Sequence, residues 1–228
     1  YLDGINERLN DFEFDHKVIS FKPDFIILET KAPVFYKHLK YIDYIKRKTN
    51  AKIFLVGDHV CYDYITPFEK SEVDFVAPDG FYDFRIKYYL KDVHSKKKLK
   101  NMNFYGIVDR KNYKIFDADK VKNKTFDLSE IPVINRNLCR LDNYGEAYLE
   151  RPIAYIMSGR GCGGNGKTPG LCAFCVWQHT LWNKKAYLRP VENLIEEMEY
   201  LYKNYGVREI FDDNDTGFVF DFEYLEKF

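Results

Sequence analysis

The sequence lacks a net charge, a long apolar run and an even set of cysteines. Its 228 residues carry 35 basic and 35 acidic side chains, so no general attraction toward nucleic acid or an anionic membrane is expected. No apolar run approaches the roughly 20 residues that a membrane span needs, and no signal peptide is evident. The sequence therefore predicts a cytoplasmic protein with no membrane span and no nucleic-acid partner.

The five cysteines are an odd number, and three of them, Cys162, Cys172 and Cys175, crowd into one glycine-rich stretch. This distribution argues against a disulfide framework and favours a metal or redox site. Cys61 and Cys139 stand apart, and we expect them to be buried as small apolar side chains. The chain is long enough for one large domain or two modest ones.

Residues 1–93 alternate apolar runs with amphipathic stretches. The runs PDFIILET, AKIFLVG and VDFVAPDG predict buried strands, and the segments that follow them predict helices. This alternation indicates a parallel, doubly wound α/β sheet, in which ligands bind beyond the carboxyl ends of the strands. Thr30, Gly57 and Gly80 stand at those ends.

The rest of the chain divides at residue 150 into two segments of different composition and hydrophobic pattern. Residues 94–150 are rich in Lys, Asn and Asp and have no long helical period, so we predict a linker. In residues 151–228, RPIAYIMS predicts a strand, RPVENLIEEMEYLYKNYG a helix closed by Gly206, and VREIFDD a strand ending in an acidic turn. The chain begins with Tyr and stops within a helical pattern, so we expect a fragment.

The stretch GRGCGGNGKTPGLCAFC, residues 159–175, fits two kinds of site. From Gly161 it matches the P-loop of nucleotide hydrolases, but Pro169 and Gly170 oppose the helix that a P-loop needs there. Alternatively, the three cysteines bind a metal. With His179 as a fourth ligand they would suit zinc, whereas three thiolates alone leave one iron of a [4Fe–4S] cluster open. The cysteine site is favoured; a zinc-stabilised binding module and a P-loop hydrolase are the alternatives.

Two further stretches, YIMSGRGCGGNGKTPGLCAFC and YLRPVENLIEEMEYLYKNYGVREIFDDNDTG, resemble the start of radical S-adenosylmethionine enzymes of the cobalamin-binding type. The chain has nine residues between Cys162 and Cys172, where that family has three. The resemblance implies that these two cysteines and Cys175 ligate a [4Fe–4S] cluster whose open iron binds S-adenosylmethionine. It also implies roles for three further residues: Phe174 would shield the cluster, and Asp212 or Asp213 would contact the methionine amino group.

The first half resembles the cobalamin-binding domain of the same family. The implied fold is a Rossmann-like parallel-sheet domain over residues 1–93 that lacks its first strand and begins at the second, YLDG. The first β/α units of a partial TIM-type barrel would follow the linker. Thr30, Gly57 and Gly80 match positions that face the cobalamin. The implied reaction is methyl transfer to an unactivated carbon of an unknown substrate, with flavodoxin or ferredoxin as electron donor. We expect the fragment alone not to turn over.

Overall fold

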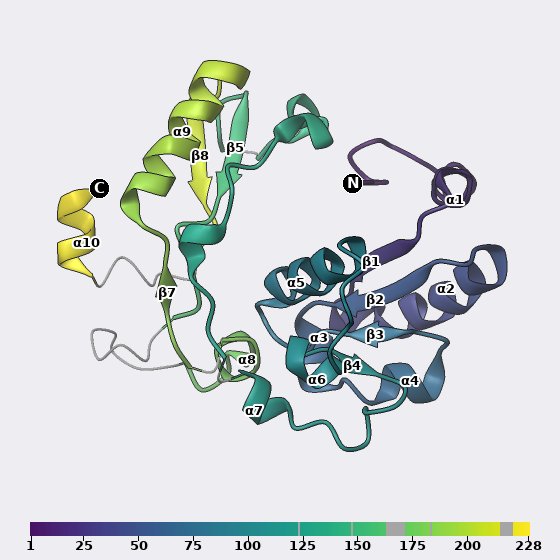
Figure 1. The fold of residues 1–228 in the computed structure, drawn as a ribbon. Helices are drawn as coiled ribbons and strands as arrows, with labels where there is room; N and C mark the ends of the chain where they lie inside the picture. Colours follow the sequence, from purple (N-terminus) through teal and green to yellow (C-terminus); the bar gives the residue numbers. More distant parts are fainter. Residues whose placement is uncertain (123, 147, 163–171, 183, 215–220) are drawn as a thin grey trace. The chain divides into compact units, whose positions relative to one another are not determined.

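The structure is a computed structural model that describes residues 1–122, 124–146, 148–162, 172–182, 184–214 and 221–228 (Figure 1). The chain forms two compact units, each built from segments that are distant in the sequence. The first unit comprises Tyr1–His16, Asp127–Ala173 and Lys184–Phe228. The second unit comprises Lys17–Phe126 and Phe174–Asn183.

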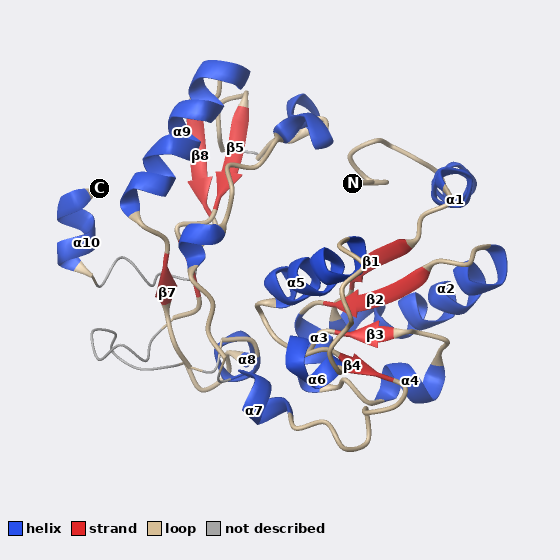
Figure 2. Cartoon of the chain, viewed as in Figure 1, coloured by secondary structure: helices blue, strands red, loops and turns tan. Residues whose placement is uncertain are grey.

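The second unit contains a four-stranded sheet in the order β1-β2-β3-β4 (Figure 2). Strands β1 (Phe25–Glu29), β2 (Lys52–Val56) and β3 (Phe75–Val76) are parallel, whereas β4 (Val108–Asp109) runs antiparallel to β3. The three predicted strands are confirmed, but the sheet is mixed rather than wholly parallel. Among the described residues the strands follow chain order without the reversal that a doubly wound sheet would have.

Helices cover both faces of this sheet because successive side chains of β2 point in opposite directions. Ile53 and Leu55 join the apolar core that contains α2, while Phe54 and Val56 join the core that contains α5. The α/β class predicted from the sequence is therefore confirmed for this unit. Its helices are α2 (Phe35–Lys48), α3 (Asp58–Tyr62), α4 (Thr66–Lys70), α5 (Tyr82–His94), α6 (Met102–Tyr105), α7 (Ala118–Lys122) and α8 (Val176–Thr180).

Part of the segment predicted as a linker packs against this sheet. Helix α6 ends at Gly106, whose φ of 70° suits glycine, and the chain turns back there to give β4. Ile107 and Val108 are fully buried. Arg85, paired with the buried carboxylate of Asp79, donates hydrogen bonds to backbone carbonyls on either side of β4. The domain boundaries at residues 93 and 150 stay a prediction.

The first unit holds a parallel pair of strands, β5 (Ile153–Ile156) and β8 (Glu209–Asp212), connected in sequence through α9 (Val191–Tyr205). Helix α9 ends at Gly206 with a φ of 64°, the left-handed conformation expected of a closing glycine. Its apolar face packs on both strands. This arrangement agrees with one β/α unit, and the partial barrel stays a prediction. Other elements are β6 (Gly159–Arg160) paired with β7 (Tyr187–Leu188), and α10 (Phe222–Lys227).

The strand predicted at YLDG is wrong. The carboxylate of Asp3 accepts hydrogen bonds from the backbone N–H groups of Ile5 and Asn6, at 3.1 and 3.0 Å, and turns the chain. Helix α1 (Asp11–Phe21) then begins with a reciprocal pair of hydrogen bonds between Asn10 and Glu13, each 2.9 Å long. No helix in the described ranges is long and apolar enough to cross a membrane.

Candidate functional site

The three clustered cysteines lie on the stretch of chain that leads from β6 to helix α8. Cys162 follows β6 and is half-buried, Cys172 is exposed, and Cys175 directly precedes α8. None of the five cysteines forms a disulfide. Residues 163–171 lie outside the described residues, and with them the Lys-Thr pair of the P-loop alternative. Where the structure describes the chain, no three Cys, His, Asp or Glu side chains are gathered around one point.

Phe174 and His179 flank the last cysteine. Phe174 is 87% exposed, so its ring presents a bare apolar surface next to Cys175. His179 lies on the exposed side of α8. The shielding role of Phe174 and the zinc-ligand role of His179 both stay predictions.

A hydrogen-bonded cluster joins the carboxyl ends of β5 and β8. Ser158, only 3% exposed, donates its backbone N–H to Oδ1 of Asp212 at 2.8 Å and its hydroxyl to Oδ2. Asn214 donates its side-chain N–H to the Ser158 hydroxyl oxygen at 2.8 Å. Both oxygens of Asp212 are therefore engaged. No local pattern pointed to Ser158 or Asn214 as site residues, because their pairing depends on the register of two strands.

After Asp212 is engaged, the side chains of Asp213 and Asn214 offer further hydrogen-bond acceptors at the carboxyl ends of β5 and β8. The backbone N–H of Asp213 continues the pairing with β5 by donating to the carbonyl of Ile156 at 2.9 Å, while its side chain is exposed. Oδ1 of Asn214 is buried and accepts no hydrogen bond from the described residues. Of the two acidic candidates, Asp213 has the carboxylate that an incoming cation can reach.

Two arginines and one glutamate form a buried ion cluster behind these strand ends. Glu197 of α9 is 1% exposed; its Oε2 lies 2.7 Å from Nη1 of Arg189 and its Oε1 lies 2.9 Å from Nη2 of Arg136. Arg189 also donates to the carbonyl of Met157 at 3.2 Å, and Arg136 to that of Tyr155 at 2.9 Å. The cluster thus fixes the backbone of β5 and of the residue that precedes Ser158.

The three predicted cobalamin positions follow β1, β2 and β3 at one edge of the sheet. Thr30 is fully buried, and its hydroxyl lies 3.1 Å from Nδ1 of His38. Gly57 has a φ of 109°, and a Cβ there would meet the carbonyl of Thr30, so only glycine fits. The structure thus brings Thr30 and Gly57 together, with the Thr30 hydroxyl already engaged.

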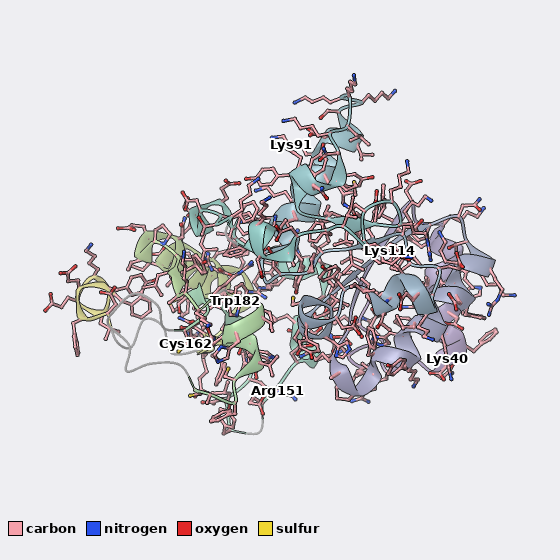
Figure 3. The ribbon with its side chains drawn as sticks, turned by 90° about the horizontal axis from the view of Figure 1, so that it is seen from below. Lys40, Lys91, Lys114, Arg151, Cys162 and Trp182 are labelled. Atoms are coloured by element: carbon pink, nitrogen blue, oxygen red, sulfur yellow. The ribbon has the colours of Figure 1, made fainter. Side chains whose placement is uncertain are left out.

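Helix α8 and the residues after it pack on this same edge. Nε1 of Trp177 donates to Oδ2 of Asp58 at 3.3 Å, and the N–H of Gly80 donates to the carbonyl of Leu181 at 3.2 Å. The ring of Trp182, labelled in Figure 3, covers the face of Gly80 where a Cβ would stand. Gly80 therefore faces a tryptophan, which the sequence did not indicate.

Comparison with known proteins points to one class of fold. No family model matches the chain. Its fold is similar to that of a radical S-adenosylmethionine methyltransferase, with a TM-score of 0.63 at 13% identity over 94% of this chain. That protein is TsrM from Kitasatospora setae, solved with tryptophan substrate and a SAM analog bound; a second TsrM structure, at 14% identity, has cobalamin and a [4Fe–4S] cluster bound.

A curated relative is also a methyltransferase by name. The chain is 25% identical, over 212 residues and 92% of its length, to an uncharacterized methyltransferase of Pyrococcus horikoshii. The chain spans about two fifths of the length of these proteins, namely 43% of the relative and 41% of TsrM. The comparisons therefore establish the likeness of fold, and they concern only part of a longer protein in each case.

Proposed function

We propose that the chain is part of a cobalamin-dependent radical S-adenosylmethionine methyltransferase that acts on an unactivated carbon. The observation that carries this proposal is the fold likeness to TsrM over 94% of the chain, because that share includes both the sheet unit and the unit with β5 and β8. Neither a zinc module nor a P-loop hydrolase would require the sheet unit, or the presence of that unit and a cysteine motif in one chain.

Cys162, Cys172 and Cys175 are the proposed cluster ligands. Their donor set fits the group, since cysteine thiolates are the usual ligands of iron–sulfur clusters and none of these thiols is consumed in a disulfide. When bound, a [4Fe–4S] cluster with S-adenosylmethionine on its open iron supplies the electron that starts radical chemistry. Phe174, exposed beside Cys175, would exclude water from the cluster.

Asp213 and Asn214 are the proposed contacts for the methionine ammonium group. Asp212 is less suited to this role than the family resemblance implied, because Ser158 occupies both of its oxygens. The exposed carboxylate of Asp213 attracts a cation, and Oδ1 of Asn214, which has no partner among the described residues, adds a neutral acceptor. Asp212 would hold Ser158, and through it the start of the cysteine loop, in place.

Cobalamin would bind along the sheet edge formed by Thr30, Gly57 and Gly80. Ligands of parallel α/β sheets bind at the carboxyl ends of the strands, which is where these residues stand. Gly57 allows close approach because it has no side chain, and Trp182 provides a flat apolar wall at Gly80. The electron donor would be a flavodoxin or a ferredoxin.

Anaerobic reconstitution with iron and sulfide tests the cluster. After reduction with dithionite, we expect a [4Fe–4S]⁺ electron paramagnetic resonance signal that shifts when S-adenosylmethionine is added. Cys172→Ser should lose the cluster, while Cys139→Ser, the matched control outside the motif, should keep it. Tight zinc binding without iron would overturn the proposal, and so would a cluster whose signal ignores S-adenosylmethionine.

Tryptophan fluorescence tests the cobalamin site separately. The chain has two tryptophans, Trp177 and Trp182, and both pack on the sheet edge where cobalamin is proposed to bind. Because the corrin absorbs near-ultraviolet light, hydroxocobalamin should quench this fluorescence with a saturable dependence on concentration. Quenching that is linear and equal to that of free N-acetyltryptophanamide would exclude binding at this edge.

A further inference from the structure

A cavity of about 490 Å³ lies in the first unit beside strand β5. This volume is in the range of small-molecule pockets, roughly 300–1,000 Å³. The wall is mostly apolar, and three of its side chains belong to the buried core of the unit. The residues that form the apolar wall are Ile134, Leu138, Leu141, Tyr144, Ile153 and Ala154.

One charged side chain, Arg136, also lines this cavity. Its guanidinium belongs to the ion cluster with Glu197 and Arg189, in which two cations share one carboxylate. The cluster therefore carries one uncompensated positive charge, and the Arg136 side chain that faces the cavity is only 14% exposed. Within the described part of the chain, Nε of Arg136 and both Nε and Nη2 of Arg189 are buried without a hydrogen-bond partner. An excess positive charge with little access to water is costly, so an anionic partner in the cavity beside Arg136 would stabilise this arrangement.

The carboxylates near the cavity wall are already engaged by other groups. Asp3 accepts hydrogen bonds from the hydroxyl of Tyr144, at 2.6 Å, and from the turn that follows it. Glu146 accepts the hydroxyl of Tyr155 at 2.6 Å. Neither pairs with Arg136, so the positive charge at the wall is not balanced from within the described part of this unit.

We propose that this cavity binds a small organic anion with one carboxylate and an apolar body. The carboxylate would pair with the Arg136 side chain where that side chain lines the cavity, and the body would lie against Leu138, Leu141 and Ile153. The apolar wall disfavours a strongly hydrated ion such as phosphate, and the single cation favours one negative charge. The site does not depend on the cysteine motif or on the proposed methyl transfer.

Octanoate and its uncharged analogue octanamide test this site. Cys139 lines the cavity, so its alkylation by iodoacetamide, followed by peptide mass spectrometry, reports occupancy at this place. We expect octanoate to slow the alkylation of Cys139 but not that of the exposed Cys172 in cluster-free protein. A charge-assisted hydrogen bond contributes about 1.5–3 kcal/mol, so octanoate should protect at concentrations at least about tenfold lower than octanamide.

Two variants separate the charge from the apolar wall. Arg136→Met removes the cation and should abolish the preference for octanoate. Leu138 is 64% exposed, so Leu138→Asp should fold normally while its carboxylate competes for Arg136, and it should also abolish octanoate protection. Leu99→Asp, on the other unit, is the matched control, and octanoate should still protect Cys139 in this variant. Equal protection by octanoate and octanamide, or full protection in Leu138→Asp, would overturn the proposal.

Discussion

Asp212 uses both of its carboxylate oxygens to hold Ser158, the residue that leaves the neighbouring strand. Oδ1 accepts the backbone N–H at 2.8 Å, and Oδ2 accepts the hydroxyl. This is possible because β5 and β8 are parallel with Ile156 opposite Asp212. The chain that leads from β5 toward Cys162 is thereby tied to β8.

Removing this carboxylate should destabilise the protein. Asp212→Ala leaves the buried N–H and hydroxyl of Ser158 without an acceptor, which costs about 1–3 kcal/mol. Asp213→Ala is the matched control; its exposed side chain should change the free energy of unfolding by no more than about 0.5 kcal/mol. Urea denaturation measures both, and equal losses in the two variants would contradict the role given to Asp212.

The buried carboxylate of Glu197 should be still more sensitive. Glu197→Gln leaves Arg136 and Arg189 facing each other in the interior without a counter-charge, and breaking a buried pair in this way costs about 3–5 kcal/mol. Glu199→Gln, on the exposed side of the same helix, breaks only the surface pair with Lys203 and should have no measurable effect. Thermal unfolding of the two variants compares them directly, and a similar melting temperature for both would show that the ion cluster is dispensable.

Strong local periodicity predicted the principal strands and helices. The three apolar runs of the first half form β1, β2 and β3, and the amphipathic stretch closed by Gly206 forms α9. Short strands were not predicted, because two residues are too few to show a hydrophobic period. Strand β4, for example, arises from the turn at Gly106 and the packing of Ile107. The cap of α1 was a missed local signal, since Asn10 and Glu13 have the spacing of a capping box.

The sequence predicted the types of residue in the candidate site but not their arrangement in space. The cysteine motif and the acidic turn are visible as residue types, but the choice between Asp212 and Asp213 depends on which of them accepts the hydrogen bonds of Ser158. The packing of Trp177 and Trp182 on the sheet edge joins segments about a hundred residues apart. No local pattern specifies such a contact, because it depends on the tertiary arrangement of the unit.

Adding one methyl group at Gly80 should displace Trp182. A Cβ at this position would overlap the indole ring, so Gly80→Ala should expose the ring and shift tryptophan emission to longer wavelength. In a Trp182→Ala background the clash is absent, so adding Gly80→Ala there should cost less stability than it costs in the parent protein. An unchanged emission spectrum in Gly80→Ala would mean that Trp182 does not pack on this glycine.

His38 should make stability depend on pH. Burial, and secondarily the charge of Lys37, lower its pKa below the usual 6.5. The unfolded chain therefore binds a proton at a higher pH than the folded chain, so the stabilisation is complete above about pH 6.5 and is lost as the pH falls through that value toward the lower folded pKa. Urea midpoints measured at pH 7.5 and pH 5.5 should differ less in His38→Gln than in the parent protein. Lys37→Gln, which keeps the imidazole and removes only the second cause, should reduce the difference partially; an undiminished difference in His38→Gln would assign the effect to other groups.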